Sequence, residues 1–265
     1  MTDYRYLDLR RESHTLVCTI NNPPRNFLNQ ATLAELNNMA DEAIADEGVC
    51  ALVITGGVDG IFITHYDVGE LVIAAKIARE NPALGSGELH GLHKFVIKLQ
   101  DSAVVTIAAV NGVAMGGGCE LALGLDFRIK STEGQFGLPE VRIGLLPGGG
   151  GTQRFARLLG AAKALELMLL GDTVDGATAE RLGLVHKTVT PDQVLPEALA
   201  LAQELAKRPQ ESVRLIKQCV YKAGEMPMDD ALHFEQEAFW KTMRTQDADR
   251  LMRAYLESAL PLDQQ

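Results

Sequence analysis

The chain has 265 residues, of which 46 % are hydrophobic and 23 % are charged, and its formal net charge at pH 7 is −10. That composition is typical of a globular protein that buries a core without disulfide bonds. Because an acidic chain repels nucleic acid and anionic lipid, we expect neither as a partner. The apolar stretches are all shorter than the roughly 20 residues that span a bilayer, so we expect no membrane segment.

Four cysteines, Cys18, Cys50, Cys119 and Cys219, are scattered along the chain. No two of them have the CxxC spacing of a redox pair or a zinc knuckle. Scattered cysteines are typical of a reducing compartment. The N-terminal residues MTDYRYLDLRRE are charged and lack the apolar centre of a signal peptide. These features together predict a cytoplasmic protein.

The first hundred residues alternate between predicted strands and predicted helices. Residues 4–10 and 15–21 are rich in apolar and β-branched residues and predict a hairpin, which the two prolines after Asn22 end. Apolar residues at helical spacing from Leu33 to about Asp46 predict a helix. The other elements expected in this half are strands at 51–55 and 61–63 and helices at 67–79 and 89–100.

The second half begins with two more predicted strands, at 104–110 and 125–130. Strands that alternate with helices are typical of the α/β class, which is the class we predict. From Gly151 onward the pattern is almost wholly helical. Residues 190–193 (TPDQ) predict a capping box at the start of one helix. Three more helices are expected at 210–223, 228–243 and 246–259.

The first segment suited to chemistry surrounds Glu120. A predicted strand ends at Val110, and three glycines at 116–118 lead into a helix whose first turn holds Glu120. Glycine allows a ligand to approach the backbone, and the free N–H groups of a helix N-terminus attract an anion or a developing oxyanion. A nucleotide loop is not indicated, because no GxGxxG occurs there and no GxxxxGK[ST] occurs anywhere. The glycines alone favour tight packing of helix against strand, and Glu120 beside them favours a functional site.

The second segment covers residues 135–154. It places Glu140 beside Pro139 in an apolar stretch and then runs through four consecutive glycines at 148–151. Four glycines in a row are costly to order, which indicates a backbone that bends tightly or opens for a ligand. A structural loop ahead of a helix would explain them nearly as well, so both interpretations stay open.

Glu120 and Glu140 form a candidate acid–base pair. The predicted strand at 125–130 lies between them, which allows the two side chains to face one another. Two neighbouring carboxylates do not ionise easily together, so such a pair supplies a proton donor and a base near neutral pH. General acid–base catalysis of this kind accelerates a reaction by roughly 10²–10⁴-fold. Most glutamates, however, lie at the surface or cap a helix, and the bare pattern favours that simpler role.

Three stretches, NGVAMGGGCEL at 111–121, FGLPE at 136–140 and LPGGGGTQR at 146–154, resemble the active-site segments of the enoyl-CoA hydratase/isomerase (crotonase) family. The resemblance continues more loosely in NNPPRNFLN at 21–29 and GLVHKTV at 183–189. It implies the crotonase fold, a spiral of ββα units, with a core at 1–190 and a C-terminal helical region at 191–265 for trimerisation. The implied assembly is a homotrimer or a homohexamer.

The same resemblance implies roles for individual residues. Glu120 and Glu140 would be the catalytic carboxylates, and the backbone N–H groups of Gly117 and Tyr66 would polarise a thioester carbonyl. The implied substrate is an acyl-CoA thioester, with CoA as part of the substrate and no metal or redox cofactor. The isomerase branch typically keeps only the second carboxylate, so the pair favours syn-addition of water to a 2-enoyl-CoA. The implied substrate-binding residues are Arg25, Phe27, Leu28, Thr64, His65, Asp67, Gly116 and Pro139.

Two departures from the family pattern concern the binding of CoA. The segment that usually reads Phe-Ser-Ala-Gly-Ala-Asp reads FITHYD at 62–67, so bulky side chains replace small ones beside the expected oxyanion donor. The lysine that many members carry near the CoA phosphates is absent, because the C-terminal stretch reads YLESA at 255–259. Arg25 and Lys76 are the substitutes we predict.

Several alternatives stay open. The same enolate chemistry would serve a double-bond isomerase or a C–C bond hydrolase, and the altered residues at 64–66 would fit a homologue that has lost activity. His90 and His93 have the i, i+3 spacing of a metal pair, but the sequence offers no third ligand and a packed pair is the simpler interpretation. His65 either contacts the substrate or fills space.

Overall fold

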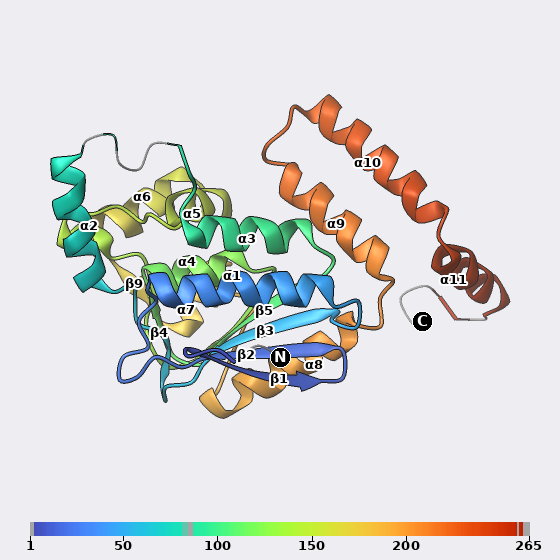
Figure 1. Cartoon of the computed structure of the whole chain (residues 1–265). Helices are drawn as coiled ribbons and strands as arrows, with labels where there is room; N and C mark the ends of the chain where they lie inside the picture. Colours follow the sequence, from blue (N-terminus) through green and yellow to red (C-terminus); the bar gives the residue numbers. More distant parts are fainter. Residues whose placement is uncertain (1–2, 82, 84–86, 259, 262–265) are drawn as a thin grey trace.

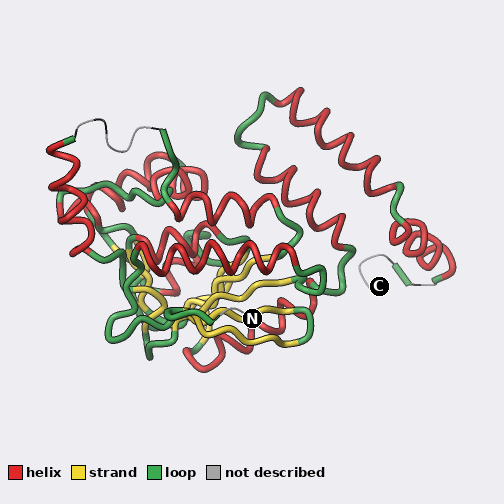
Figure 2. Tube along the Cα trace, viewed as in Figure 1, coloured by secondary structure: helices red, strands yellow, loops and turns green. Residues whose placement is uncertain are grey.

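A six-stranded sheet forms the centre of the computed structural model, which describes residues 3–81, 83, 87–258 and 260–261 (Figures 1 and 2). The edge hairpin is antiparallel, as the sequence predicts, and the later neighbours pair in parallel. The predicted α/β class is confirmed. In spatial order the strands are β1 (Leu7–Glu12), β2 (Thr15–Ile20), β3 (Ala51–Gly56), β5 (Val105–Val110), β7 (Phe127–Ser131) and β10 (Lys187–Val189).

Both faces of this sheet are buried, which explains why its inner strands read as continuous apolar runs. Along β3, Leu52 and Ile54 belong to one core cluster, whereas Ala51 and Val53 belong to the other. Three helices cover the first face and α8 covers the second (Figure 1). The covering helices are α1 (Gln30–Ala45), α3 (Gly91–Asp101), α4 (Gly117–Gly124) and α8 (Val194–Leu205).

A second, smaller sheet has the order β4-β6-β8-β9. Its first three strands are parallel, so their carboxyl ends lie at one edge. This edge collects three segments singled out above: residues 64–67 after β4, the glycines after β6, and Pro139-Glu140 after β8. The four strands are β4 (Ile61–Ile63), β6 (Val113–Met115), β8 (Phe136–Gly137) and β9 (Thr173–Val174).

Short helices surround that edge. Asp67 caps the N-terminus of α2 by accepting a 2.7 Å hydrogen bond from Gly69 N, and no residue of α2 is buried in the chain. The 3₁₀ helix η1 begins at Glu140, and the glycine run leads into α5. The bounds of this group are α2 (Val68–Glu80), η1 (Glu140–Ile143), α5 (Gly151–Leu159), α6 (Ala161–Leu170) and α7 (Gly176–Arg181).

The C-terminal segment divides into a helix that covers the sheet and three that extend from it. After α8 come α9 (Gln210–Lys222), α10 (Met228–Met243) and α11 (Gln246–Glu257), and α10 and α11 project away from the core (Figure 1). The predicted helices are present, although residue 259 of the last predicted range lies outside the described residues. Along the described chain, none of the helices is long and apolar enough to cross a membrane.

The predicted capping box at 190–193 is wrong. Thr190 is the N-cap of η2 (Pro191–Gln193), a 3₁₀ turn, and its side chain makes no capping hydrogen bond to the backbone. The Thr190 hydroxyl is engaged by the Asp192 carboxylate instead, which lowers the pKa of Asp192. The helix α8 follows directly at Val194.

Helix α9 is fixed to the core by a buried lysine. Lys217 Nζ donates to the carbonyls of Leu99 and Val104 at 3.0 and 2.6 Å and lies 2.9 Å from Asp126 Oδ2. Tyr221, one turn later, donates its hydroxyl to Asp126 Oδ1 at 2.7 Å. The side chains of Lys217 and Asp126 are 9 % and 10 % exposed, so this ion pair is largely shielded from solvent.

Candidate active site

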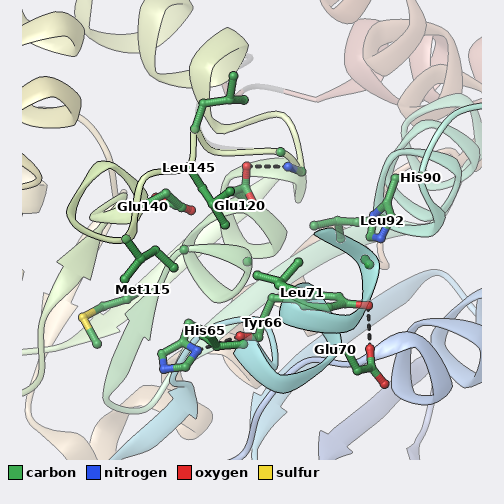
Figure 3. A pocket seen from close by; sticks show the side chains of 18 of the residues that line it. His65, Tyr66, Glu70, Leu71, His90, Leu92, Met115, Glu120, Glu140 and Leu145 are labelled. Carbon is green, nitrogen blue, oxygen red and sulfur yellow. Dashed lines mark hydrogen bonds between the residues drawn. The ribbon is translucent and has the colours of Figure 1, made fainter. Parts of the chain in front are cut away.

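A cavity of about 1040 Å³ opens at the edge of the small sheet (Figure 3). Seven of the twelve predicted site residues line it, and they come from segments up to 75 residues apart, from His65 to Glu140. Most of the remaining wall is apolar and is contributed by α2 and the loop after η1, including Leu71, Ile77, Leu145 and Leu146. The predicted residues in the wall are His65, Tyr66, Gly116, Gly117, Glu120, Pro139 and Glu140.

Glu120 lies in the first turn of α4 and is 4 % exposed. Its Oε1 accepts hydrogen bonds from Gly149 N at 2.6 Å and from Gly151 N at 2.9 Å. A Cβ on Gly149 would lie 2.6 Å from Glu120 Oε2, and Gly150 has the left-handed φ of +102°. The glycine run therefore bends tightly, which was one of the two interpretations of the sequence. The sequence did not indicate that it bends around the Glu120 carboxylate.

Glu140 lies beside Glu120 but in different surroundings. Its Oε2 is buried and has no hydrogen-bond partner among the described residues. The backbone of Gly116, with a φ of +49°, passes so close that a Cβ there would lie 3.1 Å from Glu140 Oε1. In Figure 3 both carboxylates lie on the same wall of the cavity, across from His65 and Tyr66.

These surroundings favour different protonation states. Burial raises the pKa of Glu140 to about 7, and the charge of Glu120 contributes in the same direction. Burial also raises the pKa of Glu120, but the N–H groups of Gly151 and Gly149 and the charge of Arg154 oppose that rise. Since hydrogen bonds to a carboxylate favour its ionised form, Glu120 is suited to be a base and Glu140 a proton donor near neutral pH.

Two backbone N–H groups lie near each other at the cavity. Leu28 N donates to His65 O at 3.0 Å, and Asp67 N donates to Leu28 O at 2.8 Å, so Leu28 brackets Tyr66 as in a parallel ladder. In that pattern the N–H of the bracketed residue points away from its partner. A Cβ on Gly117 would lie 3.5 Å from Tyr66 N. Within the described residues, neither the Tyr66 N–H nor the Gly117 N–H donates a hydrogen bond.

The bulky side chains of the altered segment each have a contact. The His65 ring is tilted against the Phe27 ring at 4.8 Å between centroids, and its Nδ1 lies 2.7 Å from Tyr66 O. Tyr66 donates its hydroxyl to Glu70 Oε2 at 2.8 Å (Figure 3). Burial and the neighbouring Glu70 raise the pKa of the Tyr66 phenol, so this hydroxyl stays neutral.

The other five predicted site residues lie behind the wall or outside it. Leu28 is fully buried and Phe27 is half-buried behind His65. Thr64 donates its hydroxyl to Arg25 O, which ties two segments together, and Asp67 is a helix cap. Arg25 is exposed and outside the wall, as is Lys76. Their expected roles in substrate binding stay predictions.

Sequence reasoning missed three contributors to this site. Gly149 and Gly151 hold Glu120 through their backbone, and Glu70 fixes the Tyr66 hydroxyl. The available signal was the position of Glu70 in the first turn of the predicted helix, directly after Tyr66.

His90 and His93 are packed near one another, with ring centroids 6.4 Å apart. His90 caps α3, and its ring also meets Tyr66 edge-on at 5.9 Å. Among the described residues, no group of three His, Cys, Asp or Glu side chains could hold a metal ion.

Comparison with known proteins identifies the family. The family model of enoyl-CoA hydratase/isomerase matches residues 10–262. The chain belongs to this family. Crotonyl-CoA hydratase of Syntrophomonas wolfei is 38 % identical over 96 % of both chains, and short-chain-enoyl-CoA hydratase of Clostridium acetobutylicum is 36 % identical over 94 % of both. The solved structure of Pseudomonas aeruginosa DspI, 33 % identical, superimposes with a TM-score of 0.87 and covers 97 % of this chain and 96 % of its own. The expected crotonase fold is thereby confirmed.

Proposed function

We propose that this member of the family is an enoyl-CoA hydratase, a hydro-lyase that adds water to the double bond of a 2-enoyl-CoA thioester. The observation that carries the proposal is the carboxylate pair on one cavity wall: Glu120 has two N–H donors that favour its charge, and Glu140 has an unpartnered buried oxygen and a pKa of about 7. A base and a proton donor thus lie together beside two unengaged backbone N–H groups.

The N–H groups of Tyr66 and Gly117 would polarise the thioester carbonyl. Hydrogen bonds to that oxygen withdraw electrons from the conjugated double bond, so the β-carbon becomes electrophilic and the enolate formed on attack is stabilised. Because the donors belong to the backbone, the altered side chains at 64–66 leave this step possible.

Glu120 would take a proton from the attacking water while the water oxygen bonds to the β-carbon. Glu140 would give its proton to the α-carbon, which completes syn-addition of one water molecule. Proton exchange between the glutamates and solvent then restores both residues. The reaction neither oxidises nor reduces the substrate, so the proposed mechanism needs no redox cofactor. The two backbone N–H groups would polarise the carbonyl and Glu120 would activate the water, so no step is assigned to a metal ion, and CoA enters only as part of the substrate.

The carboxylate pair also separates the hydratase from its alternatives. An isomerase shifts a proton within the substrate and needs a single carboxylate, whereas addition of water uses both. A lapsed enzyme would have no reason to keep a buried, partly protonated Glu140, since burying an ionisable group is costly. The names of the relatives given above support hydration as well.

The direct test is product analysis with crotonyl-CoA. We expect loss of the ultraviolet absorbance of the conjugated thioester and formation of 3-hydroxybutyryl-CoA, identified by mass spectrometry. A product isomeric with the substrate would support an isomerase instead. A free acid with a shortened carbon skeleton would indicate a C–C bond hydrolase, and binding without turnover would indicate a lapsed enzyme.

We further propose a homotrimer or homohexamer that acts in cytoplasmic fatty-acid metabolism. The exposed apolar side chains of α10 and α11, such as Phe239 and Trp240, support an assembly role for the C-terminal region, and the four free cysteines fit a reducing compartment. The trimerisation region predicted at 191–265 would then correspond to α9–α11, since α8 covers the core sheet.

A further inference from the structure

We infer that Arg154 is a positioning residue for the proposed base: its guanidinium holds the turn at 148–151 closed around Glu120. The kinetic consequences of this inference rest on the proposed hydration, but its structural basis does not. Arg154 is not part of the cavity wall, so it would act through the turn and not by touching substrate.

Arg154 and Glu120 both form hydrogen bonds with the backbone of Gly149. Arg154 Nη1 donates to Gly149 O at 3.0 Å, while Gly149 N donates to Glu120 Oε1 at 2.6 Å. Gly149 is thus fixed through both of its backbone groups, one toward the carboxylate and one toward the guanidinium. Without the second contact, the Glu120 carboxylate alone would hold the backbone of Gly149, in a turn made of four residues with the highest conformational freedom.

The turn is shaped around the guanidinium. A Cβ on Gly150 would lie 2.1 Å from Arg154 Nη1, and Gly150 has a left-handed φ of +102°. The backbone N of Arg154 also donates to Gly150 O at 3.0 Å, which begins α5. A side chain at Gly150 would displace the guanidinium, so the observed position of Arg154 depends on the glycine at this position.

Arg154 also provides positive charge near Glu120. Its charge lowers the pKa of Glu120 against the effect of burial. The titratable groups that interact with this pair are Glu140 from η1, His93 from α3, Cys119 from α4, Arg128 from β7, Arg157 one turn along α5, and Tyr221 from α9. Removing the arginine would therefore raise the pKa of Glu120 both directly and by loosening the two N–H contacts.

The test compares variants of the full-length protein. Arg154→Met removes the charge and the donor, Arg154→Gln keeps a donor without charge, and Arg154→Lys keeps the charge. Arg157→Met is the matched control, because Arg157 lies on the same helix and is exposed, and among the described residues its hydrogen bonds go to Gln153. Circular dichroism establishes that each variant is folded, and Arg154→Gln carries the test if Arg154→Met does not fold.

The first readout does not depend on activity. Infrared difference spectra over a pH series follow protonation of the Glu120 carboxyl, assigned by the band that disappears in Glu120→Gln. We expect Arg154→Met and Arg154→Gln to move this titration to higher pH, Arg154→Lys to move it less, and Arg157→Met to leave it in place. An unmoved titration in a folded Arg154→Met or Arg154→Gln overturns the inference.

The second readout is the pH profile of kcat/KM for crotonyl-CoA. We expect the acidic limb to move to higher pH in the neutral variants and kcat to fall about ten- to a hundredfold, as a misplaced catalytic group does, with partial rescue in Arg154→Lys. An unchanged acidic limb contradicts the inference even if stability drops. Absence of turnover in the wild-type protein would contradict only the proposed function, because the infrared titration still decides the role of Arg154.

Discussion

Glu120 and Glu140 are identical side chains whose neighbours give them different properties. Glu120 accepts two backbone N–H bonds, whereas one oxygen of Glu140 is buried without a partner. The sequence identified both residues through the family resemblance. It could not assign base and acid between them, because that difference comes from glycines 29 and 31 residues beyond Glu120.

Substitution of either glutamate tests its role in the chemistry. Glu120→Gln and Glu140→Gln keep the shape of the side chain but remove the base or the donated proton. We expect each to lower kcat for crotonyl-CoA by about 10²-fold or more while the fold is kept. The control is Glu133→Gln at an exposed turn, which should retain wild-type turnover. Near-normal turnover in either cavity variant would show that this glutamate is not catalytic.

Glu140 should also lower stability at alkaline pH. Its pKa is raised from 4.5 to about 7 in the folded protein, so the stability linked to this group is complete below the unfolded value and is lost as pH rises through about 7. Glu140→Gln has no charge to bury. The unfolding free energy of Glu140→Gln relative to wild type should therefore increase between about pH 5 and about pH 8, by on the order of 1 kcal/mol or more. The Tm difference between the two proteins, measured over this pH range, should increase with it. A Tm difference independent of pH would contradict the raised pKa.

Tyr66 separates the role of a backbone donor from that of a side chain. Tyr66→Phe removes the hydroxyl that donates to Glu70 but keeps the N–H, so kcat should stay within a few-fold while KM changes with the acyl group. Tyr66→Pro removes the N–H, and loss of one oxyanion donor costs about 10²–10³ in turnover. The measurement is kcat and KM for crotonyl-CoA and longer enoyl-CoA substrates. An inactive Tyr66→Phe would make the phenol a chemical participant.

At the scale of elements, the sequence predicted long segments well and short ones poorly. The main strands and most helices have enough residues to display periodicity, as α10 (Met228–Met243) does. Strands β6, β8 and β9 have three, two and two residues, too few to display a period, yet the sheet that they form with β4 brings the site residues to one edge. The site residues were thus recognisable one by one, while their assembly depends on pairing that no local pattern encodes.

The docking of α9 depends on one buried ion pair. Lys217→Met leaves Asp126 without its charged partner, although Thr106 and Tyr221 still donate to it. Breaking a buried pair from one side costs about 3–5 kcal/mol. We expect Lys217→Met to lose unfolding free energy of this order, measured by denaturant unfolding, and the double variant Lys217→Met/Asp126→Asn to lose less. The control Lys207→Met should lose almost none, because the Lys207 side chain is 70 % exposed. If the losses of unfolding free energy in the two single variants add up to the loss in the double variant, the pair does not couple α9 to the core.

At the scale of the whole molecule, the C-terminal arm exposes apolar surface. Ala238 is the only buried residue among those described in α10, and no described residue of α11 is buried. Phe239 is 55 % exposed and Trp240 is 50 % exposed. Large apolar side chains gathered on projecting helices are typical of a protein–protein interface. The sequence indicated these helices, but exposure became visible only once they were seen to leave the core.

Assembly can be measured directly by light scattering coupled to size-exclusion chromatography. We expect a mass of three or six chains for the wild-type protein. Trp240→Glu should shift the mass toward smaller species, because burying a charge in an apolar interface is costly. Lys241→Glu, at the exposed neighbouring position, is the control and should keep the wild-type mass. A monomeric wild-type protein would contradict the proposed assembly.

The donors at residues 66, 117, 149 and 151 all belong to the main chain, and this affects how the protein can be changed. A backbone N–H is present whatever side chain a residue carries, except in proline. The glycines at 149–151 have almost no freedom to vary, since a Cβ there would meet Glu120 or Arg154 within about 3 Å. Positions 64–66 have no such constraint on the proposed donor. A library randomised at these three positions should therefore yield catalysts with new acyl preferences, whereas one randomised in the glycine run should yield mostly inactive proteins.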